Sequence, residues 1–196
     1  MITFKSKKDV ASVEAIFSEI NARMIAALML HDQMTDYFDF LGMKGYKRLH
    51  EYQYFDESLE RKKLNQYYIN HHNKLIEDTY TGQVEVIPEN WLSANRISVG
   101  KSTKQKGIED GFNQYRSWEA ETKSLYEHYA SKLRELGAVS DALVVEKLVE
   151  NVDGELKKLD RIMIDLISSG YDMVYITEKQ SEIHDKYKAK LSEIFK

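Results

Sequence analysis

Apolar residues recur at alternating spacings of three and four along most of this chain, the spacing of one face of an amphipathic helix. The first such pattern predicts a helix from about Asp9 to Leu41. Its apolar stripe consists of Phe17, Ile20, Met24, Ala27, His31, Met34, Phe38 and Leu41. Gly42 and Gly45 follow the stripe. Because glycine often ends a helix, we expect a turn at these two residues.

Four more helices are predicted further along the chain. Their expected ranges are about 46–79, 108–136, 140–168 and 173–194. The most regular stripe belongs to the range 140–168, and it consists of Ala142, Val145, Val149, Val152, Leu156, Leu159, Met163 and Leu166. In the range 46–79 the stripe is clear only in the second half, at Leu64, Tyr68, His71 and Leu75. The inward face of the first half of that helix therefore stays ambiguous.

A long irregular segment, from Tyr80 to about Lys106, separates the second and third predicted helices. It contains the only proline, Pro88, and a QVEVI run that is typical of a short strand. About 26 extended residues at about 3.3 Å each reach some 85 Å, whereas a helix of about 30 residues is only about 45 Å long. The segment can therefore return along a whole helix, which makes the helices on either side of it parallel. The predicted fold class is all-α: a four-helix bundle with one long crossover and a short fifth helix.

The composition narrows the class of protein. With 196 residues, 42% of them hydrophobic, the chain suits one domain covering residues 1–196. A net charge of -4 provides no positive field for phosphates, so we expect no nucleic acid as a partner. No apolar run approaches the roughly 20 residues that cross a bilayer, so we expect a soluble protein with no membrane partner. The lack of cysteine excludes disulfides and thiolate chemistry, and it fits a cytoplasmic location.

The candidate functional residues are polar residues that interrupt the apolar stripes. A buried charge is costly unless it is paired, hydrogen-bonded or bound to a metal. Glu155 stands between Leu148 and Ile162 in a row of residues seven apart, which places it on a core-facing edge of its helix. His31 occupies a stripe position of the first helix. The second and third helices add Glu57, His71, Glu119 and Glu121.

Inward carboxylates and imidazoles from four helices are the ligands that a di-iron site requires. Each residue alone also has a simpler explanation. A histidine in an apolar stripe is more often a hydrogen-bonded core residue than a ligand, and Glu155 could pair with His31, His71 or Arg61. Only the convergence of these residues from separate helices favours a metal site. The adjacent His71 and His72 point about 100 degrees apart on a helix, so they are not expected to share one ion easily.

Several segments resemble the non-haem ferritins. HHNKLIEDTYTGQVEVIP is similar to the end of that family's second helix and the turn after it, with His71 at the metal histidine. SWEAETKSLYEHYASKL resembles the third helix, with Glu119 nearest to its metal glutamate. LVENVDGELKKLDRIMIDLISSGYDMVYITEKQ resembles the fourth helix and brings Glu155 close to its carboxylates. The resemblance implies a ferritin-like bundle that holds iron, in a di-iron site.

The departures from the family pattern indicate an altered iron-oxidising centre. Counted from INARM, which resembles the start of the family's first helix, the metal glutamate falls on Ala27, with His31 one turn later. The second-helix motif is a glutamate followed three residues later by histidine, but Tyr68 precedes His71 by three. Another register puts Tyr54 and Glu57 on that motif instead. In the fourth helix Asp153 competes with Glu155, and the apolar stripe favours Glu155.

These observations leave three functions open. The first, which the resemblance implies, is binding of ferrous iron, its oxidation by oxygen as a ferroxidase, and storage of the ferric product in a homo-oligomer. The second is a non-catalytic bundle that has lost its metal and serves as a scaffold or partner-binding protein. The third is another di-metal carboxylate enzyme, which would need an apolar substrate pocket beside the metals. Ala27 favours the second function, and an inward Glu155 favours the first.

Overall fold

The computed structural model describes residues 9–80, 82, 84, 86, 95, 96 and 99–195. Within these ranges the chain forms five long helices. They are α1 (Val13–Phe40), α2 (Lys44–His72), α4 (Lys101–Glu135), α5 (Val139–Ser168) and α6 (Met173–Ile194). The all-α prediction is confirmed, and the last helix has the bounds that its apolar pattern predicts.

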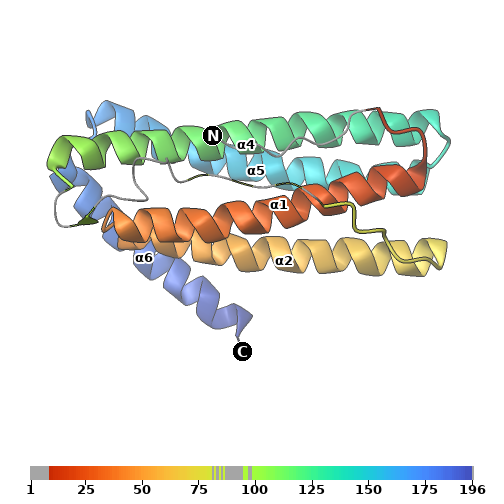
Figure 1. Ribbon diagram of the computed structural model, residues 1–196, viewed down its shortest axis with the longest axis horizontal. Helices are drawn as coiled ribbons and strands as arrows, with labels where there is room; N and C mark the ends of the chain where they lie inside the picture. The colour runs from red at the N-terminus through yellow and green to blue at the C-terminus, as the bar shows by residue number, and fades with distance from the viewer. Residues whose placement is uncertain are drawn as a thin grey trace.

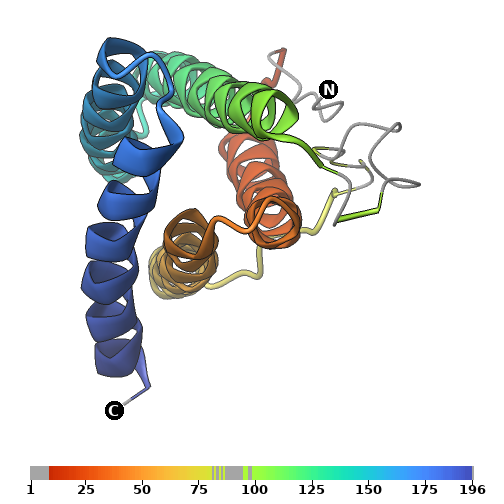
Figure 2. The ribbon, with the colours of Figure 1, turned by 90° about the vertical axis from the view of Figure 1, so that its left-hand side faces the viewer.

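The first four helices form a bundle of two antiparallel hairpins, α1 with α2 and α4 with α5 (Figure 1). Helices α2 and α4 run in the same direction, as the long connection between them predicts. The shorter α6 starts at one end of the bundle and crosses α2 obliquely (Figure 2). No helix in the described ranges is long and apolar enough to cross a bilayer.

Helix boundaries differ from the sequence prediction mainly at the ends of the crossover. Helix α2 ends at His72 rather than near residue 79, because Asn73 adopts the left-handed conformation with φ 55° and its N–H bonds to the carbonyl of Ile69. Leu75, which the stripe places inward, is 81% exposed. Helix α4 begins at Lys101, seven residues earlier than expected, since its polar first turns extend beyond the buried Ile108.

The turn between α1 and α2 depends on two glycines with different roles. Gly42 has φ 78°, and the N–H of Met43 bonds back to the Phe38 carbonyl at 2.8 Å, so Gly42 ends α1 as expected. Gly45 lies inside α2 instead. A Cβ at this position would lie 2.0 Å from the carbonyl oxygen of Gln180. Gly45 therefore allows the backbones of α2 and α6 to meet.

The core follows the predicted stripe closely in α1, because the seven stripe residues on the helix and Leu41 just after it are all at most 5% exposed. Val84 and Val86 of the crossover are also buried. The described residues of the QVEVI run form no strand; Gln83, Glu85 and Ile87 lie outside the described residues. The side chain of Gln33 on α1 bonds to the backbone of both valines, donating to the Val84 carbonyl and accepting from the Val86 N–H. The Gln33 amide thus provides the backbone hydrogen bonds that a neighbouring strand would otherwise provide.

Candidate metal-binding sites

Three helices bring carboxylates together around a cavity of about 290 Å³ in the bundle. Helix α2 supplies Glu57 and Glu60, which are three residues apart and so share a face. Helix α4 supplies Glu119, and α5 supplies Glu155. The cavity is lined by Gln53, Asp56, Glu57, Glu60, Glu119, Glu150, Asn151, Val152, Gly154, Glu155 and Lys158. Three of the sequence-predicted ligands, Glu57, Glu119 and Glu155, therefore meet here.

The surroundings of this cavity disfavour negative charge on its carboxyl groups. Burial, followed by the charge of Glu119, raises the pKa of Glu57 well above its ordinary value. Burial and then the charge of Glu155 raise the pKa of Glu119 to about 8. The pKa of Glu60 is also raised, chiefly by burial and by Asp56. Desolvation and mutual repulsion thus favour protonated carboxyls, as expected for clustered acids without enough positive charge.

Helix α1 faces these acids with a cation, Arg23, rather than with a carboxylate. Its side chain is 1% exposed and lies over the Trp118 ring, with the guanidinium carbon 3.4 Å from the ring centroid. It donates to the Thr122 hydroxyl at 2.9 Å and to the Trp118 carbonyl at 3.0 Å. Its charge lowers the pKa of Glu119 in part, against burial and Glu155. The sequence reasoning missed Arg23, although a charged residue directly before the stripe residue Met24 was a visible signal.

Glu155 lies at the edge of the cavity, with 25% of its side chain exposed. It accepts hydrogen bonds from Gln53 Nε2 at 2.9 Å and Lys158 Nζ at 2.5 Å. Its described partners are thus different from the three that the sequence suggested. Asp153, the competing residue on α5, instead pairs with Lys123 and Lys157 at 2.8 and 2.6 Å. Of the two residues, Glu155 is the one that lines the cavity.

His31 packs against His50 of α2, a histidine that the sequence did not identify as its partner. Their Nδ1 atoms are 3.0 Å apart, and both side chains have 0% exposure. Both Nε2 atoms lack a hydrogen-bond partner among the described residues. Burial lowers the pKa of His31 to about 3 and that of His50 well below its ordinary value. Both rings are therefore neutral at physiological pH.

The histidine pair is connected to the carboxylate cavity by two polar side chains. The Tyr115 ring lies 5.3 Å from the His31 ring and 4.9 Å from the His50 ring, centroid to centroid. Gln53 Nε2 donates to the Tyr115 hydroxyl at 2.9 Å and also to Glu155. The imidazoles thus neighbour the cavity without lining it.

The remaining two predicted ligands, Glu121 and His71, lie outside the cavity. The Glu121 side chain is 55% exposed, and its carboxylate is 3.6 Å from the Arg23 guanidinium. His71 is exposed at the end of α2. There it forms, with His72 and Asp141, a group whose potential ligand atoms all lie within 4.8 Å of one another. The six predicted residues therefore divide among four places: the cavity, the histidine pair, the surface beside Arg23 and the end of α2. His71 lies apart because α2 places it about 16 Å further along its axis than Glu60.

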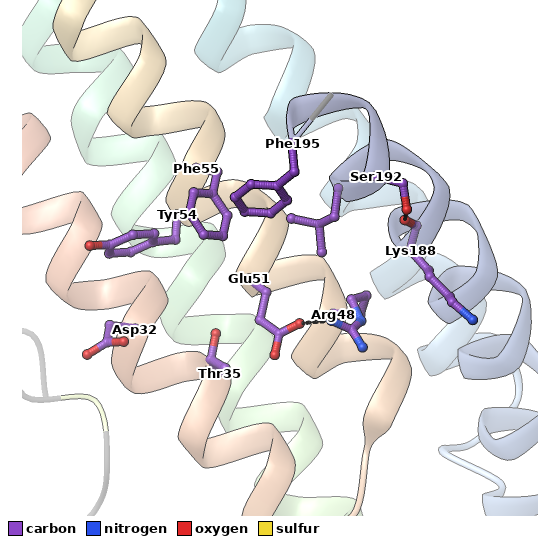
Figure 3. Close-up of a pocket in the computed structure, with 10 residues that line it drawn as sticks. Asp32, Thr35, Arg48, Glu51, Tyr54, Phe55, Lys188, Ser192 and Phe195 are labelled. Atoms are coloured by element: carbon purple, nitrogen blue, oxygen red, sulfur yellow. Dashed lines mark hydrogen bonds and ion pairs between the residues drawn. The ribbon is translucent and has the colours of Figure 1, made fainter.

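A wider hollow of about 780 Å³ lies between α1, α2 and α6 (Figure 3). Inside it Arg48 Nη1 donates to Glu51 at 2.6 Å, and the rings of Phe55 and Phe195 meet edge to face with centroids 4.9 Å apart. Its α2 residues lie on the opposite face of that helix from Gln53, Glu57 and Glu60. The hollow does not adjoin the carboxylates, so it gives no support to the third function, which needs a substrate pocket beside the metals.

Comparisons with known proteins give the class of fold. In sequence, the chain matches no protein-family model and no curated protein. In structure, it matches a ferritin from the archaeon Archaeoglobus fulgidus engineered into a closed form, with TM-score 0.70 and 15% identity over 93% of this chain and 97% of the other. The open-pore ferritin of the same hyperthermophile matches with TM-score 0.69 and 15% identity, over 87% and 94% of the chains.

A third solved structure, described as a humanized archaeal ferritin, matches with TM-score 0.71 and 13% identity, over 93% and 96% of the chains. The fold of this protein is therefore the ferritin-like bundle, which confirms the fold that the sequence resemblance implies. At such low identity the likeness concerns the fold alone, and function must be argued from the site.

Proposed function

We propose that this protein binds ferrous iron as a substrate in the carboxylate cavity and oxidises it with oxygen. The proposal rests mainly on one observation. Acidic side chains from α2, α4 and α5 line one cavity, where burial and then mutual repulsion raise the pKa values of Glu57 and Glu119. A divalent cation would supply the missing positive charge, and hard oxygen ligands suit iron. The ferritin-like fold supports the same interpretation.

The ligands that the cavity offers differ from one helix to the next. Glu57 and Glu60 on α2 would hold the ion from one side and Glu119 on α4 from the other, while the partly exposed Glu155 lies at the edge of the cavity. An all-carboxylate set stabilises ferric iron more than ferrous iron because the attraction grows with the charge of the ion. This preference favours loss of an electron to oxygen. Arg23 occupies the side towards α1, so the ion would bind between the other three helices.

The decisive experiment compares two substitutions on the same helix. Glu119→Gln removes a cavity carboxylate, and Glu121→Gln removes an exposed carboxylate two residues away. We expect Glu119→Gln to reduce the initial rate of ferrous oxidation, followed by absorbance of the ferric product, by at least tenfold, and Glu121→Gln to leave it unchanged. Equal rates in the wild type and Glu119→Gln would refute oxidation at this cavity.

A second function, a bundle that has lost its metal and binds a partner or acts as a scaffold, is favoured by Arg23. A fixed cation beside Glu119 replaces part of the charge that a metal would bring. This alternative predicts that purified protein contains no stoichiometric iron and that anaerobic ferrous iron leaves its melting temperature unchanged. Elemental analysis of protein purified without chelator separates the two functions.

Storage of ferric iron would additionally require a closed homo-oligomer with an enclosed space. Exposed apolar residues suited to subunit contacts include Leu143, Ile164, Ile167 and Val174. Light scattering during size-exclusion chromatography would measure the assembly directly. A monomer at micromolar concentration would exclude storage and leave binding and oxidation as the function.

A further inference from the structure

A second group of metal-ligating side chains lies at the end of the bundle, away from the carboxylate cavity. His71 and His72 form the last turn of α2, and Asp141 belongs to the first turn of α5. The potential ligand atoms of the three all lie within 4.8 Å of one another. His72 Nε2 is 2.9 Å from Asp141 Oδ1. Although adjacent helical residues diverge, the two imidazoles lie close, with ring centroids 4.9 Å apart.

Neighbouring aromatic rings hold both imidazoles in place. The Tyr67 ring stacks on His71 at 5.3 Å with an interplanar angle of 14°. The Tyr68 ring packs on His72 at 4.5 Å, and the Phe17 ring meets His72 edge to face at 6.0 Å. Each tyrosine precedes its histidine by four residues, so the helix itself sets both contacts. The side chains are thus positioned before any ion binds.

The carboxylate of this group is also oriented and incompletely neutralised. The Tyr67 hydroxyl donates to Asp141 Oδ1 at 3.0 Å. Asp141 is 3% exposed, and among the described ion pairs its partner is His72, not a lysine or arginine. A buried carboxylate without a permanent cation is costly, and a divalent ion would offset that cost. A hydroxyl that orients a ligating carboxylate is a common outer-sphere feature of metal sites.

We propose that His71, His72 and Asp141 bind a divalent transition-metal ion of the zinc type, with water completing the coordination. Two imidazoles and one carboxylate suit zinc, copper, nickel or iron, whereas magnesium and calcium prefer oxygen ligands. Ligands about 2.1 Å from a tetrahedral ion are about 3.4 Å apart. The potential ligand atoms already lie within 4.8 Å of one another, so small side-chain rotations would bring them to that separation. The site is independent of the carboxylate cavity, because α2 separates Glu60 from His71 by about 16 Å.

A simple ion pair between His72 and Asp141 is the competing explanation, and His71 distinguishes the two. His71 is exposed and has no described contact with Asp141, so His71→Ala leaves that pair intact and the fold undisturbed. A zinc titration by calorimetry, read in parallel through the histidine ring protons by NMR, is the test. The wild type should bind one zinc ion with shifts at His71 and His72, and His71→Ala should weaken that binding at least tenfold.

Two further variants complete the test. Tyr67→Phe retains the ring that stacks on His71 but removes the hydroxyl on Asp141, and it should weaken zinc binding less than His71→Ala does. His184→Ala is the matched control, because His184 also lies beside an aspartate, Asp185 at 3.1 Å, but on the surface of α6. It should leave zinc affinity unchanged. Zinc binding that is absent in the wild type, or equally strong in His71→Ala, would overturn the proposal.

Discussion

The bundle holds two buried polar regions side by side, and they avoid charge in opposite ways. At the His31–His50 pair, burial lowers the pKa values, so the imidazoles lose their protons and become neutral. In the neighbouring cavity, burial and mutual repulsion raise the pKa values of Glu57 and Glu119, so the carboxyls keep their protons. The same low-dielectric interior thus produces neutral bases in one region and neutral acids in the other.

The difference between the histidine pair and the carboxylate cavity indicates which of the two regions would bind a cation. Neutral imidazole can bind a metal ion, but His31 and His50 pack against the Tyr115 ring and do not line the cavity. The carboxyls would release their protons to a cation and be stabilised by it. For this reason the proposed iron substrate belongs in the cavity, although histidine is the more familiar metal ligand.

The largest expected effect is stabilisation of the wild type by iron. Anaerobic ferrous iron at about 100 times its dissociation constant should stabilise the folded state by about 2.7 kcal/mol. Since a domain of this size shifts by about 2–4 °C per kcal/mol, the melting temperature should rise by roughly 5–10 °C. The double variant Glu57→Gln/Glu119→Gln, made together with His71→Ala to remove the second site, should show no rise. His31→Leu/His50→Leu should retain it, and a loss there would place the imidazoles among the ligands.

The next effect concerns the histidine pair alone. Replacing only His50 with Leu leaves neither ring nitrogen of His31 with a hydrogen-bond partner among the described residues. We expect a loss of about 2 kcal/mol in the free energy of unfolding at pH 7. Replacing both histidines with Leu removes both sets of buried polar atoms and should cost less than the single change. Urea unfolding of the three proteins measures this. A double variant less stable than His50→Leu would show that the pair itself stabilises the bundle.

The free energy of unfolding of the metal-free protein should depend on pH in opposite ways through His31 and through Glu119. The pKa of His31 falls from 6.5 to about 3 on folding, so its contribution to stability is complete above pH 6.5 and is lost as pH falls towards 3. The pKa of Glu119 rises from 4.5 to about 8, so its contribution is complete below pH 4.5 and is lost as pH rises towards 8. Stability without metal should therefore decline on both sides of the range between 4.5 and 6.5.

Glu119→Gln tests whether Glu119 causes the loss of stability that we expect at alkaline pH. The amide keeps the shape of the side chain without its charge, so the apo variant should be more stable than the wild type by about 1 kcal/mol at pH 8.5. At pH 4.5, where the wild-type carboxyl is protonated, the difference should nearly disappear. Chemical unfolding at both pH values, in the presence of chelator, measures the change. A benefit that is equal at both pH values would show that charge is not its cause.

The sequence predicted those features of the fold and site that depend on the apolar pattern of a single helix or on the length of a segment. The α1 stripe gives the burial of His31, and the α5 stripe gives the inward edge of Glu155. The lengths of the helices and of the crossover give the parallel course of α2 and α4. These predictions succeed because apolar periodicity and chain length are local properties.

The predictions that were missed or wrong concern residues whose position depends on contacts between helices. The polar first half of α2 hid its inward face, so His50 could not be recognised as the partner of His31 and Glu60 was not paired with Glu57. Arg23 is buried because it lies against Trp118 on α4, which its own helix does not reveal. His71 lies outside the cavity because α2 carries it about 16 Å beyond Glu60, to the end of the bundle, where Asn73 ends the helix.

The smallest effect tests whether the two polar regions are energetically linked. Gln53 Nε2 donates both to Tyr115 and to Glu155, so removing one acceptor changes what the other contributes. Tyr115→Phe should cost about 1 kcal/mol, and a double-mutant cycle with Glu155→Ala should give a coupling of about 0.5 kcal/mol. Tyr115→Phe combined with Glu121→Gln is the control and should be additive. Additivity in both cycles would mean that the imidazole pair and the carboxylate cavity are neighbours without communication, and that their pH responses can be altered separately.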